Sequence, residues 1–500
     1  MRPNMKDLLL KTAGTTCTEN GAVTNISTGN DVLNLFALGG AVRNRSIQDV
    51  VDLIDAAWRE DQDLALRVIF YLGDVRGGQG ERDFFFNALR YLAVKSPDLT
   101  RKLIILIPEY SRWDMVFAFI GTPVEKQALR VLKFQFEKDL ESQRPSLLAK
   151  WLPSPGTKSQ KALSVVVARA FGLELGAYRK LRAALNRKID TVEVKMSARQ
   201  WEDIDFEKVP GKAFMNYQKA FERHGYQKMQ KFVEKIQKGE VKVKSETLYP
   251  HEIVRKALSA NGTEEVTLQS AWDNLPNYIK DGRQGIAVID TSASMTGLHS
   301  GRTVEPILVA KALGMYLSER LSGPYKDHYI TFSEDPIMAK FHGSTIASRY
   351  RNMREIVAST NIEAVYDLIL DVAVRNNLPQ SEVPSHLYIF SDMEFNSATS
   401  NAWGSRRCST PNLTLYQTIQ RKYRSYGYEM PVTIFWNLDA RNNQHPVTQH
   451  ESGAALVSGF SPSTFQYIME GIILTPFQTM MKVLDAPRYA MLSELFEDLN

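Results

Sequence analysis

The sequence predicts a chain of two parts, an all-helical first half and a doubly wound, mostly parallel α/β domain. Its 500 residues exceed what one hydrophobic core usually organises, which favours two or more domains. Apolar residues recur at helical spacing from about residue 46 to 260, whereas short apolar runs alternate with helical stretches later in the chain. We therefore predict a helical region at 1–260, a connector at 261–281 and an α/β domain at 282–500.

The first half is built from amphipathic helices. Ser46 is suited to cap a helix in which Ile47, Val50 and Ile54 share one face. Further helical stretches are expected at 64–72, 84–93, 103–107, 124–136 and 162–171. Helices with short connections and almost no strand pattern favour stacked antiparallel pairs, as in an α-solenoid, with a compact bundle as the alternative.

The second half alternates strands and helices. Strands are expected at 285–289, 328–332, 387–390, 432–436 and 454–458, and helices at 303–321 and after Thr360. Uniformly apolar strands that alternate with helices indicate a parallel sheet covered on both faces. Because such sheets bind ligands beyond the carboxyl ends of their strands, the loops after Ile289 and Phe390 are predicted to carry the functional site.

Those loops contain the residues of a divalent-cation site. The first strand is followed by Asp290, Ser292 and Ser294, and Thr360 and Asp392 come later where a helix begins and a strand ends. Mg²⁺ prefers hard oxygen ligands in octahedral geometry and keeps several waters. We expect the three hydroxyls to bind Mg²⁺ or another divalent cation directly and the two carboxylates to hold its waters. The alternatives are a serine-rich turn that caps a helix, and the same fold with its site unused.

This pattern resembles the metal-ion-dependent adhesion site of von Willebrand A domains. The resemblance implies a cation with an open position that takes a carboxylate from a protein partner. Ala358 and Ser359 precede Thr360 where the family commonly has glycines, a departure that leaves the expected ligand in place.

A helical region followed by such a domain resembles the Ro ribonucleoprotein family. There a ring of HEAT-like repeats, the TROVE module, is closed by a von Willebrand A domain. Segments similar to related TROVE-like proteins of viruses, bacteria, plants and fungi are VRGGQGERDFF (75–85), LLAKWLPS (147–154), LYPHEIV (248–254) and IFSDMEF (389–395). The resemblance implies a monomeric ring that binds small or misfolded noncoding RNA. We expect the segment 33–44 to close this ring against the C-terminal domain.

Basic residues outnumber acidic ones between 176 and 260, which suits contact with RNA phosphates. The side chains predicted to contact RNA are Arg76, Arg82, Arg179, Lys180, Arg182, Arg187, Lys188, Lys212, Lys219, Arg223, Lys228, Lys231 and Lys235. Aromatic residues suited to base stacking lie among them, namely Phe214, Tyr217, Phe221, Tyr226 and Phe232. The competing interpretation is an ordinary amphipathic helix, with lysines in solvent and aromatic residues buried.

The glycine-rich segment RGGQGERD lacks the G-K-[ST] ending of a P-loop and follows no strand, so we expect an inter-helix turn. Its Arg76 and Arg82 would face RNA or pair with Asp74, Glu81 or Asp83.

No pattern of catalytic residues stands out, so the sequence predicts a protein that is not an enzyme. The histidines show no metal-ligand spacing, and a nuclease would gather more carboxylates around its metals. Two distant cysteines, Cys17 and Cys408, and no apolar run long enough to span a membrane predict a cytoplasmic protein. The leading hypothesis is an RNA-binding scaffold. The alternatives are a Mg²⁺-dependent protein-interaction module, including a viral structural or assembly role, and a metal-dependent nuclease.

Overall fold

The computed structural model describes residues 14–279, 284–296, 304–333, 335–355, 360–395, 414–468 and 474–497. Three features named above lie outside these ranges: Cys408, the pair Ala358 and Ser359, and the predicted boundary at 281. Among the described helices, none has the length and apolar character needed to cross a membrane.

The first part of the chain is helical from Asp31 onward, as predicted, but the expectation of an all-helical region at 1–260 is wrong near its start, where two short strands within residues 15–25 pair with each other. Its helices are α2 (Asp31–Gly39), α3 (Ile47–Glu60), α4 (Gln62–Gly73), α5 (Arg82–Lys95), α6 (Pro97–Leu103), α7 (Ile107–Tyr110), α8 (Glu125–Glu141), α9 (Leu148–Trp151), α10 (Lys161–Phe171), α11 (Leu175–Ile189), α12 (Val192–Ser197), α13 (Gly211–His224), α14 (Tyr226–Gln237), α15 (Pro250–Ala257) and α16 (Thr263–Asp273). Ser46 caps α3 by accepting a hydrogen bond from the Asp49 backbone N–H at 3.1 Å, which confirms the predicted start.

Four of the other predicted helical stretches lie within or largely within α4, α5, α8 and α10. The predicted stretch at 103–107 is helical, but it is not one regular α-helix. There α6 ends at Leu103, a 3₁₀ turn covers Ile104–Leu106, and α7 begins at Ile107. Pro108 explains the break, because its ring and missing N–H are tolerated in the first turn of a helix but not in its interior.

The second part contains a six-stranded sheet with the order β5-β4-β3-β6-β7-β8. Its strands are β3 (Gly285–Ile289), β4 (His328–Thr331), β5 (Met338–Lys340), β6 (His386–Ser391), β7 (Val432–Asn437) and β8 (Ala454–Ser458). The helices of this part are α17 (Pro306–Arg320), α18 (Ile346–Arg351), α19 (Ile362–Arg375), α20 (Leu415–Ser425), α21 (Phe465–Ile468), α22 (Pro476–Leu484) and α23 (Ala490–Glu497). All five predicted strands are present, and only the unpredicted edge strand β5 is antiparallel.

Both faces of the sheet are covered, as the apolar strands predicted. On β3, Ile286 and Val288 point into a core shared with α19 and α20. The alternate residues Ala287 and Ile289 point to the other face, into a core shared with α17 and the N-terminal helices. The helical region and one sheet face therefore share a continuous hydrophobic core.

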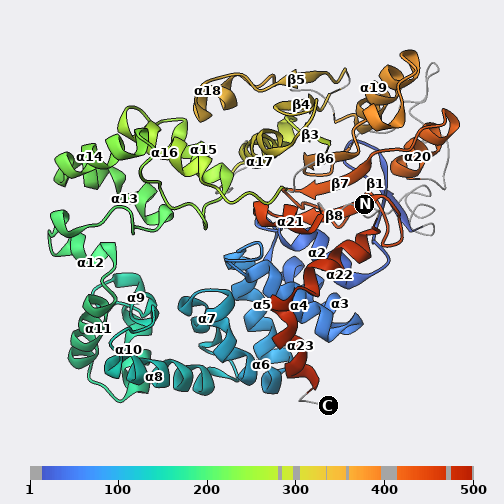
Figure 1. Ribbon diagram of the computed structural model, residues 1–500. Helices are drawn as coiled ribbons and strands as arrows, with labels where there is room; N and C mark the ends of the chain where they lie inside the picture. The colour runs from blue at the N-terminus through green and yellow to red at the C-terminus, as the bar shows by residue number, and fades with distance from the viewer. Residues whose placement is uncertain are drawn as a thin grey trace.

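The two ends of the chain each cross to the other part of the molecule (Figure 1). Near the N-terminus, β1 (Thr15–Cys17) and β2 (Val23–Asn25) form a hairpin that lies against the α/β part, where Asn25 and His445 exchange backbone hydrogen bonds at 3.0 Å. At the other end, α22 and α23 pack on α2 and α4.

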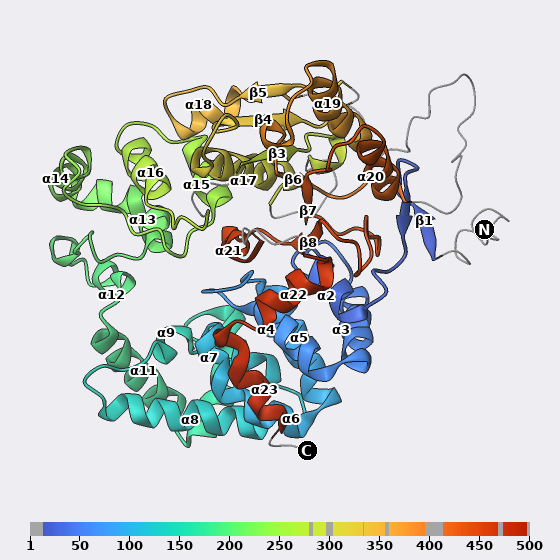
Figure 2. The ribbon, with the colours of Figure 1, turned by 45° about the vertical axis from the view of Figure 1, so that its right-hand side comes forward.

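The expected contact between segment 33–44 and the C-terminal part is confirmed. Helix α2 packs on β8, the Gly40 N–H donates to Ser458 Oγ at 2.9 Å, and Ser458 Oγ donates to the Phe36 carbonyl at 2.9 Å. From α2 the helices follow an arc that returns to the sheet where α15 contacts α17 (Figure 2). The two arms of the arc also touch, since the Tyr249 hydroxyl donates to the Gln79 carbonyl at 2.9 Å.

The RGGQGERD segment is the inter-helix turn that the sequence predicts, between α4 and α5. A side chain at Gly78 would collide with the Tyr71 carbonyl, which a Cβ atom would approach to 1.9 Å. The turn is tightly held because the buried Gln79 side chain donates to the Thr464 and Tyr71 hydroxyls at 2.6 and 2.7 Å.

Candidate metal centre

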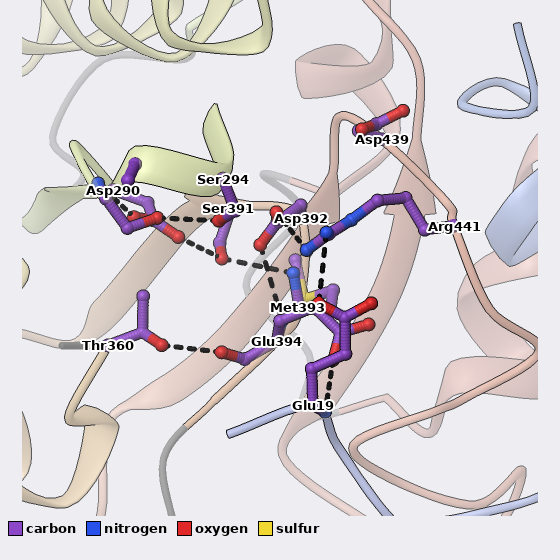
Figure 3. A network of polar contacts seen from close by, with 12 residues as sticks. Glu19, Asp290, Ser294, Thr360, Ser391, Asp392, Met393, Glu394, Asp439 and Arg441 are labelled. Atoms are coloured by element: carbon purple, nitrogen blue, oxygen red, sulfur yellow. Dashed lines mark hydrogen bonds and ion pairs between the residues drawn. The ribbon is translucent and has the colours of Figure 1, made fainter. Parts of the chain in front are cut away.

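The carboxyl ends of β3 and β6 bring the predicted metal-site residues together. These strands are parallel neighbours in which Ile289 pairs with Phe390. The Asp290 N–H donates to the Phe390 carbonyl at 3.1 Å, which extends the ladder by one residue. Asp290 and Asp392 consequently leave the sheet at the same edge, as the strand pattern predicted (Figure 3).

Asp290 lies fully buried at the bottom of this site. One carboxylate oxygen accepts the Ser292 N–H at 2.9 Å, and the other accepts the Ser391 hydroxyl at 2.6 Å. Burial and the neighbouring Asp392 charge raise the pKa of Asp290 to about 7. The negative charges of these two buried carboxylates repel each other, and a bound cation would relieve that repulsion.

The two serines stand at the start of the turn after β3. Their hydroxyl oxygens are 2.9 Å apart, and Ser292 directly precedes a 3₁₀ turn at Ala293–Met295. The Ser294 hydroxyl also bonds the Asp392 carboxylate. Asp392 is 3% exposed, and burial raises its pKa although Arg441 opposes the shift. The D-x-S-x-S turn thus lies directly against the second aspartate.

Thr360 reaches the same rim from the segment before α19. Its hydroxyl donates to the Glu394 carbonyl at 2.5 Å, and the Glu394 N–H lies 3.4 Å from an Asp392 carboxylate oxygen. Met393, between the two acids, has a backbone φ of 66°. A left-handed conformation is uncommon for a non-glycine residue and is often found at functional loops.

Several residues at this rim were not predicted. Ser391 supports Asp290, and Glu394 accepts the Glu19 N–H at 2.8 Å and the Asn442 amide at 2.9 Å. Arg441 contacts Asp392 at 2.8 Å. Ligands of parallel sheets bind beyond the carboxyl ends of the strands. Applied to the strand at 432–436, this rule would have predicted that the following loop, with Arg441 and Asn442, contributes to the site. No sequence signal placed the N-terminal hairpin here.

The residues present fit a hard divalent cation. Three neutral hydroxyls and two buried carboxylates supply oxygen only, the donor type that Mg²⁺ prefers. Thr360 Oγ1 donates a hydrogen bond to the Glu394 carbonyl and accepts one from the Asn20 amide at 3.2 Å, and these two contacts fix the orientation of its hydroxyl at the rim. Among the described residues no group of three or more His, Cys, Asp or Glu side chains is arranged to hold a metal.

The predicted RNA-contacting residues do not form one uniform surface. Some have protein partners. Arg82 pairs with Asp114 at 3.1 Å rather than with Asp74, Glu81 or Asp83, and Arg76 donates to the Glu109 carbonyl at 2.5 Å. The other engaged residues are Arg182, Lys188, Lys212, Lys228 and Lys235, which contact Leu152, Leu140, Glu252, Glu202 and Glu207 respectively.

The remaining predicted cations are exposed, and none forms an ion pair with a described residue. They are Arg179, Lys180 and Arg187 on α11, Lys219 and Arg223 on α13, and Lys231 on α14. The stacking prediction is wrong for three of the aromatic residues. Phe214, Phe221 and Phe232 pack with Phe206 in the helical core, because they occupy the apolar faces of α13 and α14. Of the other two aromatic residues, Tyr226 is 63% exposed and Tyr217 is half-buried.

The fold and site define a helical region joined to a mixed α/β domain with an oxygen-lined rim. Two family models match this chain, each described as a domain of unknown function: DUF2828 over residues 18–105 and 169–281, and DUF7788 over residues 284–485. The chain is also similar to uncharacterized protein L728 of Acanthamoeba polyphaga mimivirus. The two are 27% identical over 515 residues, which span 94% of this chain and 87% of the viral protein.

Proposed function

We propose that the C-terminal part is a von Willebrand A-like binding domain that holds Mg²⁺ at the β3–β6 edge and captures an acidic group of a protein partner. The observation that carries the proposal is the convergence of Asp290, Ser292, Ser294, Thr360 and Asp392 in one hydrogen-bonded network. Residues separated by more than a hundred positions meet there with the donor set that the sequence pattern anticipates.

The chemistry of the donors explains why binding, rather than catalysis, is proposed. Neutral hydroxyl ligands leave the charge of a bound cation largely uncompensated, so that it attracts an external carboxylate. Asp290 and Asp392 are anchored by protein donors and would orient the water ligands of the cation. A hydrolytic metal site would be expected to gather more direct carboxylate ligands.

Conservative substitutions at the rim should abolish tight cation binding. We expect Thr360→Val and Asp290→Asn each to weaken Mn²⁺ binding about 10–100-fold, because each removes an oxygen or a charge that the cation needs. Titration of the full chain with Mn²⁺, followed by electron paramagnetic resonance of the free ion, measures the affinity. Asp371→Asn removes an exposed carboxylate on α19 and serves as the matched control. Unchanged affinity in both rim variants would contradict the proposal.

A second candidate function is RNA binding by the helical part, with the whole chain acting as a Ro-like scaffold. The observation that favours it is the set of exposed cations without an ion-pair partner in the described chain, at Arg179, Lys180, Arg187, Lys219, Arg223 and Lys231. Phosphate contacts require such available charges, whereas a lysine already paired with a carboxylate gains less from them.

The RNA candidate is tested by reversing three of these charges. The triple variant Lys219→Glu, Arg223→Glu and Lys231→Glu should weaken binding of a structured RNA and reduce the slope of log affinity against log salt by about 2–3. Fluorescence anisotropy over a salt series gives both quantities. The matched control reverses Lys326, Lys340 and Arg424, which are exposed on the α/β part. An equal loss in both triple variants would show only a response to net charge.

A further inference from the structure

The turn between β1 and β2 lies directly on the candidate metal rim. The turn is compact, since the Thr18 N–H donates to the Ala22 carbonyl and the Gly21 N–H to the Thr18 carbonyl, both at 2.9 Å. Its tip carries Glu19 and Asn20, and Figure 3 shows Glu19 beside Glu394 and Arg441. A segment from the start of the chain therefore covers a site formed some 270 to 420 residues later.

Asn20 touches a predicted cation ligand itself. Its amide nitrogen lies 2.6 Å from the Glu394 carbonyl and 3.2 Å from Thr360 Oγ1. The Thr360 hydroxyl donates to the same carbonyl, so Asn20 and this carbonyl together fix the orientation of the Thr360 hydroxyl. Asn20 acts here as a positioning residue for Thr360.

Glu19 forms a solvent-exposed ion pair with Arg441 at the rim. Arg441 lies between two acids, with one guanidinium nitrogen 2.8 Å from Asp392 and another 3.1 Å from Glu19. The Asp392 side chain is 0% exposed and that of Glu19 is 55% exposed. Asp392 is thus the permanent partner of Arg441, and Glu19 is the partner that solvent can replace.

The body of the hairpin holds this tip in place. Ala22 and Val23 are buried against α19 and α20, and the Thr24 hydroxyl donates to the His445 carbonyl at 2.8 Å. The tip consequently stays near Arg441 at a high effective concentration, although its exposed ion pair contributes little free energy. A partner can displace Glu19 without unfolding the hairpin.

We propose that Glu19 is an internal occupant of the rim, and that an acidic segment of a partner protein binds by replacing it on Arg441. This inference rests on the proposed function, because the partner's second contact would be the cation held by Thr360 and the two serines. It adds a residue that sets specificity, Arg441, and an intramolecular competitor, Glu19. The partner segment needs neighbouring acidic side chains, one for Arg441 and one for the cation.

The test compares variants of the full chain in binding fluorescein-labelled hexaglutamate, measured by anisotropy with Mg²⁺ and with a chelator. Glu19→Gln should tighten binding about two- to fivefold in Mg²⁺, because exposed ion pairs contribute up to about 1 kcal/mol and 1.4 kcal/mol is tenfold. Arg441→Gln should weaken binding, and Glu19→Gln should give no gain in the Arg441→Gln background. Glu141→Gln, at an exposed position near the end of α8, controls for the change in net charge.

The outcomes separate this inference from the proposed function. The internal-occupant proposal is overturned if Glu19→Gln binds hexaglutamate no more tightly than the unmodified chain. It is also overturned if Glu141→Gln increases the hexaglutamate affinity by as much as Glu19→Gln does. The same holds if no form binds the peptide. Mn²⁺ titration of the same samples tells the two failures apart. If Mn²⁺ still binds but Glu19→Gln does not increase the hexaglutamate affinity, only the role of Glu19 is overturned. If Mn²⁺ does not bind, the proposed metal site is overturned as well.

Discussion

Replacing Asp74 with alanine is expected to lower the free energy of unfolding by about 3–5 kcal/mol, the range for breaking a buried ion pair from one side. Asp74 is fully buried at the end of α4. Its carboxylate accepts hydrogen bonds from Nε and Nη2 of Arg488, the latter at 2.8 Å. It also accepts a hydrogen bond from the Tyr489 hydroxyl at 3.2 Å. It further accepts the Arg76 N–H at 2.9 Å.

The loss is large because the other groups stay behind without their acceptor. Among the described residues, the Arg488 guanidinium would keep the Glu109 carbonyl at 3.1 Å, a distant Glu109 carboxylate at 3.9 Å and the face of Tyr110. The pair joins α4 to the segment before α23, so its loss should also release the C-terminal helix. Urea unfolding and hydrogen exchange of α23 measure the two effects.

A second ion pair between the same parts of the chain provides the control. Arg67 on α4 pairs with Asp485 at 2.9 Å, but the Asp485 side chain is 58% exposed. Asp485→Ala should therefore cost less than about 1 kcal/mol. In addition, Asp74→Ala combined with Arg488→Ala should cost less than the sum of the single changes, since the pair acts as a unit. Equal losses at Asp74 and Asp485 would contradict a special role for the buried pair.

Local patterns in the sequence were sufficient to predict most elements and the residues that meet at the candidate metal site. Helical and strand periodicity located α4, α5 and the strands β3, β6 and β7, because the buried faces of these elements repeat at fixed spacing. The site followed from topology, since neighbouring parallel strands bring the residues after their carboxyl ends to one edge. The edge strand β5 was missed because its three residues are largely exposed and carry no apolar pattern.

Contacts between distant segments could not be read from local patterns. Asp74 pairs with Arg488 and Asn20 meets Thr360, yet neither pair has a spacing that a helix or strand would impose. For the same reason, the sequence could not show which of the predicted RNA-contacting cations remain free of protein partners among the described residues. The sequence gives Lys219 and Lys235 similar helical positions, but Glu207 from a neighbouring loop pairs with Lys235 at 3.4 Å. Only the packing of that loop decides which of the two lysines remains available.

Acidification is expected to weaken the attachment of the β1–β2 hairpin through His445. This residue is 1% exposed, its backbone pairs with Asn25, and its ring Nε2 has no hydrogen-bond partner among the described residues. Burial lowers the pKa of His445 to about 3 from its ordinary value of 6.5. The unfolded chain therefore binds a proton near pH 6 that the folded chain does not take up.

The sign of the effect follows from this difference. The contribution of the neutral His445 ring to the free energy of unfolding is complete above pH 6.5 and decreases as the pH falls toward 3. At pH 5 the loss from His445 amounts to about 2 kcal/mol, at about 1.4 kcal/mol for each pH unit below the ordinary value. His251 is also fully buried with a lowered pKa, so part of the acid sensitivity will remain when His445 is replaced.

The measurement compares urea unfolding at pH 7.5 and pH 5 for the unmodified chain, His445→Gln and His450→Gln. Glutamine does not titrate in this range, so His445→Gln should lose about 2 kcal/mol less than the unmodified chain. His450 is exposed on the same loop, and its replacement controls for the loss of a histidine side chain in this part of the molecule. Because the Thr24 hydroxyl and Asn25 bind the His445 backbone, loosening there should also raise hydrogen exchange at Glu19 and Asn20. Identical pH dependence in all three proteins would contradict the assignment of this acid sensitivity to His445.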